Sequence, residues 1–199
     1  MMLMHRSVQL RGLAASPRQG ANSTLLLDTV LAEAERGGCR VEKIEIFRLN
    51  IRPCQGCGGC DSTGVCVLED DMHRIYPLLQ EPADIILAAP IYFYTLSAVA
   101  KAFIDRSQAL WVRKYRLRSQ PLLPRGDGYL IATGATRGKR LFECPRLTMR
   151  YFYDALNRNY AGDLLVPGVE NEGAVLAKEA VMEEACALGR AIAAKTNSM

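Results

Sequence analysis

Two short runs of almost purely apolar residues constrain the fold of this chain most strongly. They are residues 84–89 (DIILAA) and residues 128–133 (GYLIAT), and each has the length of one strand. A strand that is apolar on both sides is typical of the interior of a parallel sheet, whose two faces are covered by helices. Segments with helical periodicity separate these runs from each other and from the rest of the chain. The sequence therefore predicts an α/β fold.

The same reading along the whole chain predicts five strands that alternate with helices. We expect strands over residues 6–13, 40–47, 84–89, 128–133 and 162–166. We expect helices over residues 22–36, 70–80, 97–117, 140–157 and 172–195. Parallel strands need right-handed crossovers, which leaves few topologies. The expected architecture has three layers, with a five-stranded parallel sheet between two layers of helices. It forms one domain over residues 1–199.

Composition and charge exclude several classes of protein. The net charge is +4, from 25 Lys and Arg against 21 Asp and Glu, which does not indicate nucleic-acid binding. No apolar stretch has the length of a membrane span. The first ten residues include His5 and Arg6 and do not read as a signal peptide, so we expect a cytoplasmic protein. The basic residues from Arg113 to Arg125 are interpreted as the solvated end of a helix.

Ligands of parallel sheets bind beyond the carboxyl ends of the strands, so the loops there are informative. The loop after the first strand is small and polar and leads directly into a helix. The free N–H groups and the positive dipole at the start of that helix favour an anion such as phosphate. The side chains that can add hydrogen bonds or charge are Ser16, Arg18, Asn22, Ser23 and Thr24. Alternatively, Asn22 or Ser23 only caps the helix.

The loops after the third and fourth predicted strands are also unusual. The third strand leads into an aromatic run, Pro90, Ile91, Tyr92, Phe93 and Tyr94. The fourth leads into a glycine-containing run, Thr133, Gly134, Ala135, Thr136, Arg137 and Gly138. Aromatic groups suit a flat heterocycle, and glycine permits close backbone approach, although a hydrophobic plug and an ordinary turn are the alternatives. Together the three loops predict a mononucleotide site. A five-stranded flavodoxin-like sheet of order 2-1-3-4-5 would bind FMN there.

Clustered cysteines form the second motif, within a loop over about residues 52–68. The spacing is C-x2-C-x2-C-x5-C, with Cys54, Cys57, Cys60 and Cys66. Four thiolates suit a [4Fe–4S] cluster or Zn²⁺, and the close steps with interspersed glycines favour iron and sulfide. A metal-free dithiol is the third interpretation. The scattered cysteines are expected to be buried small apolar residues, Cys39, Cys144 and Cys186.

Six short motifs of the chain occur together in one known family. They are SPR with NST (residues 16–18 and 22–24), the cysteine run, DDM (70–72), PIY (90–92), KAFIDR (101–106) and GATRG (134–138). Together they resemble the NADPH-dependent FMN reductase family, and most of all its iron–sulfur flavoprotein branch. The resemblance implies FMN bound by the three loops above, and cluster ligation by Cys54, Cys57, Cys60 and Cys66. It further implies a homodimer or homotetramer, and ferredoxin or NAD(P)H as electron donor.

The first functional hypothesis is therefore an FMN-dependent oxidoreductase that passes electrons between a [4Fe–4S] cluster and FMN. This chemistry needs no acid–base residue, so no catalytic residue is assigned. The second is an NAD(P)H-dependent FMN reductase or quinone-type oxidoreductase without a cluster. The third is a zinc-bearing binding protein without catalysis. Iron, zinc and flavin analysis distinguishes the three.

Overall fold

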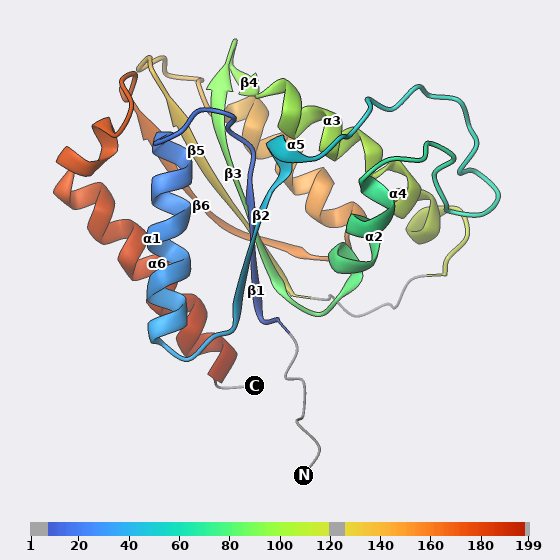
Figure 1. Cartoon of the computed structure of the whole chain (residues 1–199), viewed down its shortest axis with the longest axis horizontal. Coiled ribbons are helices and arrows are strands. Elements are labelled where there is room, and N and C mark those ends of the chain that lie inside the picture. The colour runs from blue at the N-terminus through green and yellow to red at the C-terminus, as the bar shows by residue number, and fades with distance from the viewer. Residues whose placement is uncertain (1–7, 120–125, 198–199) are drawn as a thin grey trace.

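A central parallel sheet organises the computed structural model, which describes residues 8–119 and 126–197 (Figure 1). The strands are β1 (Leu10–Ala14), β2 (Val41–Glu45), β3 (Asp84–Tyr92), β4 (Thr95–Leu96), β5 (Asp127–Gly134) and β6 (Asn159–Pro167). The order is β2-β1-β3-β5-β6 with parallel pairing throughout, and the short β4 pairs antiparallel with β3. The predicted five-stranded order is thereby confirmed. His5, Arg6 and Arg125, named above, lie outside the described residues.

Helices cover both faces of the sheet, as Figure 1 shows. On one face lie α1 (Asn22–Arg36) and α6 (Glu179–Asn197); on the other lie α2 (Met72–Gln80), α3 (Ala98–Arg106), α4 (Gln108–Tyr115) and α5 (Glu143–Ala155). Two short 3₁₀ helices span Ile46–Arg48 and Ala174–Ala177. Successive β3 residues alternate between two buried clusters, with Ile85 in one and Ile86 in the other. This explains why residues 84–89 are apolar throughout. None of the described helices combines the length and hydropathy needed to cross a bilayer.

Two predicted elements differ from the structure for identifiable reasons. The helix expected over residues 97–117 is interrupted at Ser107. The Arg106 carbonyl there accepts a hydrogen bond from the Tyr76 hydroxyl at 2.8 Å, and the Leu110 N–H bonds to the Ser107 carbonyl instead. The aromatic loop is in fact a hairpin, because β3 continues to Tyr92 and β4 returns from the turn formed by Phe93 and Tyr94. Both turn residues have positive φ, 49° and 63°.

Close packing of α5 against β5 depends on the absence of a side chain at Gly128. A Cβ there would lie 2.3 Å from the ring of Tyr153. That ring is fully buried, and its hydroxyl donates to the Tyr129 carbonyl at 2.6 Å and accepts from the Leu87 N–H at 3.2 Å. We expect Gly128→Ala to lower the free energy of unfolding by about 3 kcal/mol, measured by urea denaturation.

The matched control for this prediction is Gly162→Ala in the neighbouring strand β6. Its Cβ would meet the Tyr129 ring at 3.7 Å, an ordinary contact, so we expect a change within about 0.5 kcal/mol. Equal effects of the two substitutions would contradict the packing argument.

Candidate functional site

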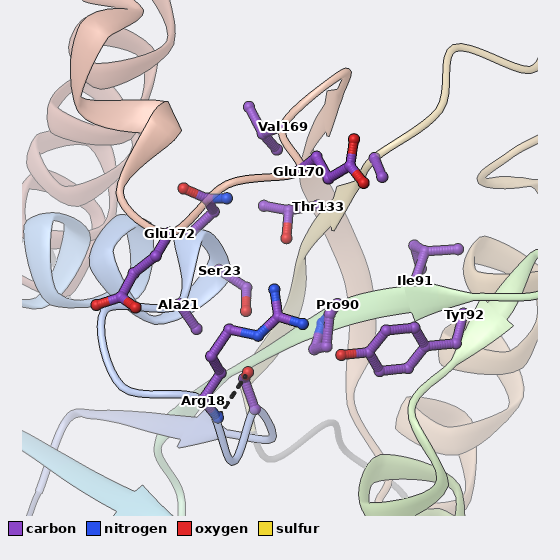
Figure 2. A pocket seen from close by; sticks show the side chains of 13 residues that line it. Arg18, Ala21, Ser23, Pro90, Ile91, Tyr92, Thr133, Val169, Glu170 and Glu172 are labelled. Carbon is purple, nitrogen blue, oxygen red and sulfur yellow. Dashed lines mark hydrogen bonds between the residues drawn. The ribbon is translucent and has the colours of Figure 1, made fainter.

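A cavity of about 230 Å³ lies at the carboxyl ends of β1, β3 and β5, where the sequence places the mononucleotide site (Figure 2). The predicted residues that line it are Ser16, Arg18, Asn22, Ser23, Pro90, Ile91, Tyr92, Thr133 and Ala135. They come from the three predicted loops, which are brought together because the strands that precede them are parallel neighbours. In Figure 2 the guanidinium of Arg18 reaches in between Ser23 and Pro90.

The start of α1 forms the polar side of this cavity. Ala21 occupies the N-cap position, without a side-chain cap, so the expectation that Asn22 or Ser23 only caps the helix is wrong. The Asn22 side chain instead donates to the Asn171 carbonyl at 2.9 Å and accepts from the Val175 N–H at 3.0 Å. It thereby holds the segment after β6 against α1.

Two hydroxyl groups at this helix start have no protein partner. Ser23 Oγ and Thr24 Oγ1 are buried and make no hydrogen bond. A buried hydroxyl without a partner costs about 1–3 kcal/mol, so such groups usually meet a ligand or water. The first-turn N–H groups of α1 also lack intrahelical partners, and Arg18 supplies positive charge. The cavity is therefore suited to an anion of the size of a phosphate group.

A second cavity of about 250 Å³ adjoins the first, and the two share Ile91 and Ala135. Its other lining residues are Phe93, Tyr94, Thr136 and Leu141. The phenyl ring of Phe93 is fully exposed at the tip of the β3–β4 hairpin. A polar compartment and an aromatic compartment thus lie side by side.

Some predicted site residues lie outside both cavities, and some lining residues were not predicted. Thr24, Gly134, Arg137 and Gly138 line neither cavity. The Arg137 guanidinium packs against Gly168 instead. The unpredicted lining residues are Leu141 in the second cavity and Ala21, Val169, Glu170 and Glu172 in the first. The last three follow β6, and applying the strand-end argument to the last strand as well would have found them.

The four clustered cysteines line a third cavity, of about 450 Å³, which shares no lining residue with the other two. The cysteines belong to the loop between the 3₁₀ helix at Ile46–Arg48 and α2, and this loop runs beside α3 and α4 in Figure 1. Burial raises the pKa of Cys60, and the nearby Asp61, Cys66 and Cys54 raise it too. Across residues 8–119 and 126–197, no three His, Cys, Asp or Glu side chains are arranged to hold one metal ion.

A buried arginine joins the two ends of the cysteine loop. Arg106 donates to the Arg52 carbonyl at 2.8 Å and to the Leu68 carbonyl at 3.2 Å, and it forms an ion pair with Asp70. We call this group of contacts the arginine clasp. Arg106 and Asp70 have completely buried side chains. The clasp fixes where the loop leaves the domain and where it returns.

The basic residues at the end of α4 are solvated in part, as expected, because Arg116 and Arg118 are exposed, but three of the basic residues also bind neighbouring segments. Arg113 donates from Nε to the Gly64 carbonyl at 2.7 Å. Arg116 forms an ion pair with Asp61 at 2.7 Å, and Lys114 pairs with Asp154 on α5 at 2.7 Å. These cations therefore hold the cysteine loop and α5 in place.

The scattered cysteines differ in exposure. Cys39 is buried, as expected, but Cys144 is exposed and Cys186 is half-buried. Cys144 lies in the first turn of α5, on the solvent side, so its interpretation as a core residue is wrong.

Comparison with known proteins agrees with this geometry. The model of the NADPH-dependent FMN reductase family matches residues 8–140. The chain belongs to this family. The matched region includes β1, β3, β5 and the whole cysteine loop. It also includes the residues from Ser16 to Thr136 that line the first two cavities.

Several relatives are named iron–sulfur flavoprotein. One from Archaeoglobus fulgidus is 42% identical over 95 residues, which are 48% of this chain and 43% of the relative. One from Methanosarcina thermophila is 32% identical over 113 residues, 57% of this chain and 59% of the relative. The matches thus span less than two thirds of these relatives.

Solved structures share the fold. The NAD(P)H:quinone oxidoreductase from Methanothermobacter marburgensis has a TM-score of 0.68 at 15% identity, covering 93% of this chain and 98% of that one. The Trp repressor binding protein from Bacillus subtilis has a TM-score of 0.60 at 21% identity, covering 90% and 98%.

Proposed function

We propose that this chain is an FMN-dependent oxidoreductase that exchanges electrons between FMN and a [4Fe–4S] cluster. FMN would occupy the two adjoining cavities at the strand ends, and Cys54, Cys57, Cys60 and Cys66 would hold the cluster. The observation that carries the proposal is the gathering of all four cysteines around one cavity, in a chain whose cavity at the strand ends offers the unpartnered Ser23 hydroxyl to a phosphate.

The first two cavities fit the parts of FMN. The phosphate would lie at the start of α1, where Ser23 and Arg18 line the cavity and would bind it. The flavin ring would lie toward Tyr92 and the aromatic compartment with Tyr94. FMN accepts one or two electrons, which lets it exchange with a one-electron centre. The protein residues bind and orient it.

The cysteine cavity fits a cluster better than one zinc ion. Zinc would need its thiolates at about 2.3 Å from one point, whereas the four cysteines line a cavity of about 450 Å³. In a [4Fe–4S] cluster each thiolate binds a different iron, so the sulfurs lie further apart around a larger volume. Gly56, Gly58 and Gly64 have φ of 63°, 71° and 67°, a conformation that glycine adopts without strain. The names of the relatives also support iron and sulfide.

The remaining parts of the proposal concern partners and location. We propose a cytoplasmic homodimer or homotetramer, because the flavin and cysteine cavities share no lining residue and a second copy could bring a cluster to the flavin. Ferredoxin or NAD(P)H would supply the electrons. Sedimentation would measure the assembly, and anaerobic stopped-flow mixing with each donor would identify the faster reductant of the flavin.

Cofactor analysis of anaerobically purified protein tests the proposal. We expect bound FMN with about four iron atoms and four sulfides per chain. Flavin without iron, bleached rapidly by NAD(P)H, would favour a cluster-free quinone-type oxidoreductase. Colourless protein with about one zinc per chain would favour a zinc-bearing binding protein.

Removing one unpartnered hydroxyl should separate flavin affinity from stability. We expect Ser23→Ala to weaken FMN binding by about 10- to 100-fold, because a hydrogen bond to a charged group contributes about 1.5–3 kcal/mol. The FMN-free variant should be at least as stable as the parent, since a buried unpaired hydroxyl is lost. Fluorescence titration and urea unfolding measure the two effects.

The control for this substitution is Thr29→Ala on the same helix. The Thr29 hydroxyl donates to the Leu25 carbonyl at 3.0 Å and does not line the cavity. It should leave FMN affinity unchanged. Unchanged affinity in Ser23→Ala would remove the phosphate assignment at α1.

A further inference from the structure

One N–H group of the arginine clasp has no partner. A guanidinium carries five N–H bonds in a rigid plane. Both Nη atoms of Arg106 are fully used, because Nη1 donates to the Arg52 carbonyl and to Asp70, and Nη2 donates to the Leu68 carbonyl and to Asp70. The Nε atom is buried and makes no hydrogen bond. Burial of a charged donor without a partner is costly, so this group calls for an acceptor that it does not yet meet in the ligand-free protein.

The cysteine cavity offers such an acceptor. Arg106 lines that cavity together with Cys66 and the other three cysteines. The charge of Arg106 and the Cys66 sulfur lie close enough to interact. The clasp fixes the plane of the guanidinium from its other end, so the direction of the Nε–H bond is fixed before any ligand binds.

We propose that the Nε–H group of Arg106 donates a hydrogen bond to the Cys66 sulfur when that sulfur ligates the cluster, and that this bond makes the cluster easier to reduce. The inference rests on the proposed function, because it requires the cluster. A hydrogen bond to a ligand sulfur stabilises the more negative, reduced state and so raises the reduction potential. Arg106 is then a positioning and tuning residue for electron transfer. The competing partner for Nε–H is a water molecule in the cavity.

A pair of arginine variants tests the effect on potential. Arg106→Lys keeps the positive charge beside Asp70 but has no N–H at the Nε position. At a fixed potential we expect the ratio of reduced to oxidised cluster to fall about tenfold, which for a one-electron couple is about 59 mV toward negative potential. The matched control is Arg113→Lys. Arg113 also donates a hydrogen bond to the loop, at the Gly64 carbonyl, but it does not line the cavity. The ratio of reduced to oxidised cluster should therefore stay within about twofold of the parent value.

A measurement on the unmodified chain avoids any failure of the lysine variant to fold or load iron. Arginine labelled with ¹⁵N at Nε alone is incorporated, and the reduced cluster is studied by pulsed electron paramagnetic resonance. We expect a ¹⁵N coupling that persists in Arg113→Lys. The label excludes the backbone N–H of Arg52 and the Nη atoms.

The outcomes separate this inference from the proposed function. The inference is supported if the parent protein binds iron and shows the ¹⁵N coupling, and if Arg106→Lys shows the lowered ratio of reduced to oxidised cluster. If iron is bound but the coupling is absent, or the ratio is unchanged in Arg106→Lys, the inference is overturned while the cluster proposal stands. Water is then favoured as the partner of Nε–H. Absence of iron from the parent protein after anaerobic reconstitution overturns the cluster proposal, and this inference with it.

Discussion

Replacing Asp70 with leucine is expected to lower the free energy of unfolding by about 3–5 kcal/mol, because it leaves the buried charge of Arg106 without its counter-ion. Both side chains are completely shielded from solvent. The substitution also removes the acceptor for the N–H groups of Arg52 and Met72, each bonded to the carboxylate at 3.0 Å. Urea unfolding followed by circular dichroism measures the loss.

Two further variants make this prediction specific to the buried pair. Combining Asp70→Leu with Arg106→Met removes both charges and should recover a large part of the lost stability, as happens when buried pairs are replaced by apolar residues. Asp61→Leu breaks the half-exposed ion pair with Arg116 and should cost less than about 1 kcal/mol. Equal losses in Asp61→Leu and Asp70→Leu would show that burial is not the cause.

The same pair gives the stability of the protein a defined dependence on pH. Burial alone would raise the pKa of Asp70, but the hydrogen bonds from Arg106, Arg52 and Met72 outweigh it and lower the pKa. A carboxylate with a lowered pKa in the folded state stabilises the fold above its unfolded pKa of about 3.9. That stabilisation is lost as pH falls through the folded pKa. The difference between the parent and Asp70→Leu should therefore be constant at neutral pH and shrink below about pH 4.

The sheet could be predicted from sequence because its signals are local. Residues 84–89 and 128–133 are apolar on both sides, and only a central parallel strand buries both. The helix over Asn22–Arg36 agrees with its predicted bounds, since Gly37 and Gly38 end the helical periodicity. The break at Ser107 was not predictable, because it depends on a hydroxyl from α2, Tyr76, that is distant in sequence.

The residues of the candidate site likewise divide into those that local sequence signals predict and those that depend on contacts between distant residues. The cavity at the strand ends follows from a rule about parallel sheets, so Ser16, Ser23 and Pro90 could be named in advance. The arginine clasp could not be, because a sequence gives no sign that the arginine of KAFIDR is buried and bonded to residues 38 and 54 positions away. Electrostatic partners of long side chains are set by tertiary packing.

Alanine at Cys57 is expected to abolish iron binding while leaving FMN bound. Each cysteine of a [4Fe–4S] site ligates one iron, so removing a thiolate leaves one iron without its protein ligand. The cysteine cavity and the two strand-end cavities share no lining residue, so the flavin site should be unaffected. Anaerobic reconstitution followed by iron, sulfide and flavin analysis measures the result, and the broad visible absorbance of the cluster should disappear.

Cys144→Ala is the matched control for this loss, because Cys144 is an exposed free thiol that does not line the cysteine cavity. It should retain the iron, sulfide and FMN content of the parent. Iron that stays at the parent level in Cys57→Ala would remove Cys57 from the ligand set. Iron lost equally from both variants would mean that thiol oxidation during preparation, and not ligand removal, controls the iron content. Loss of FMN together with iron in Cys57→Ala alone would show that the two sites are coupled, against the separation of their cavities.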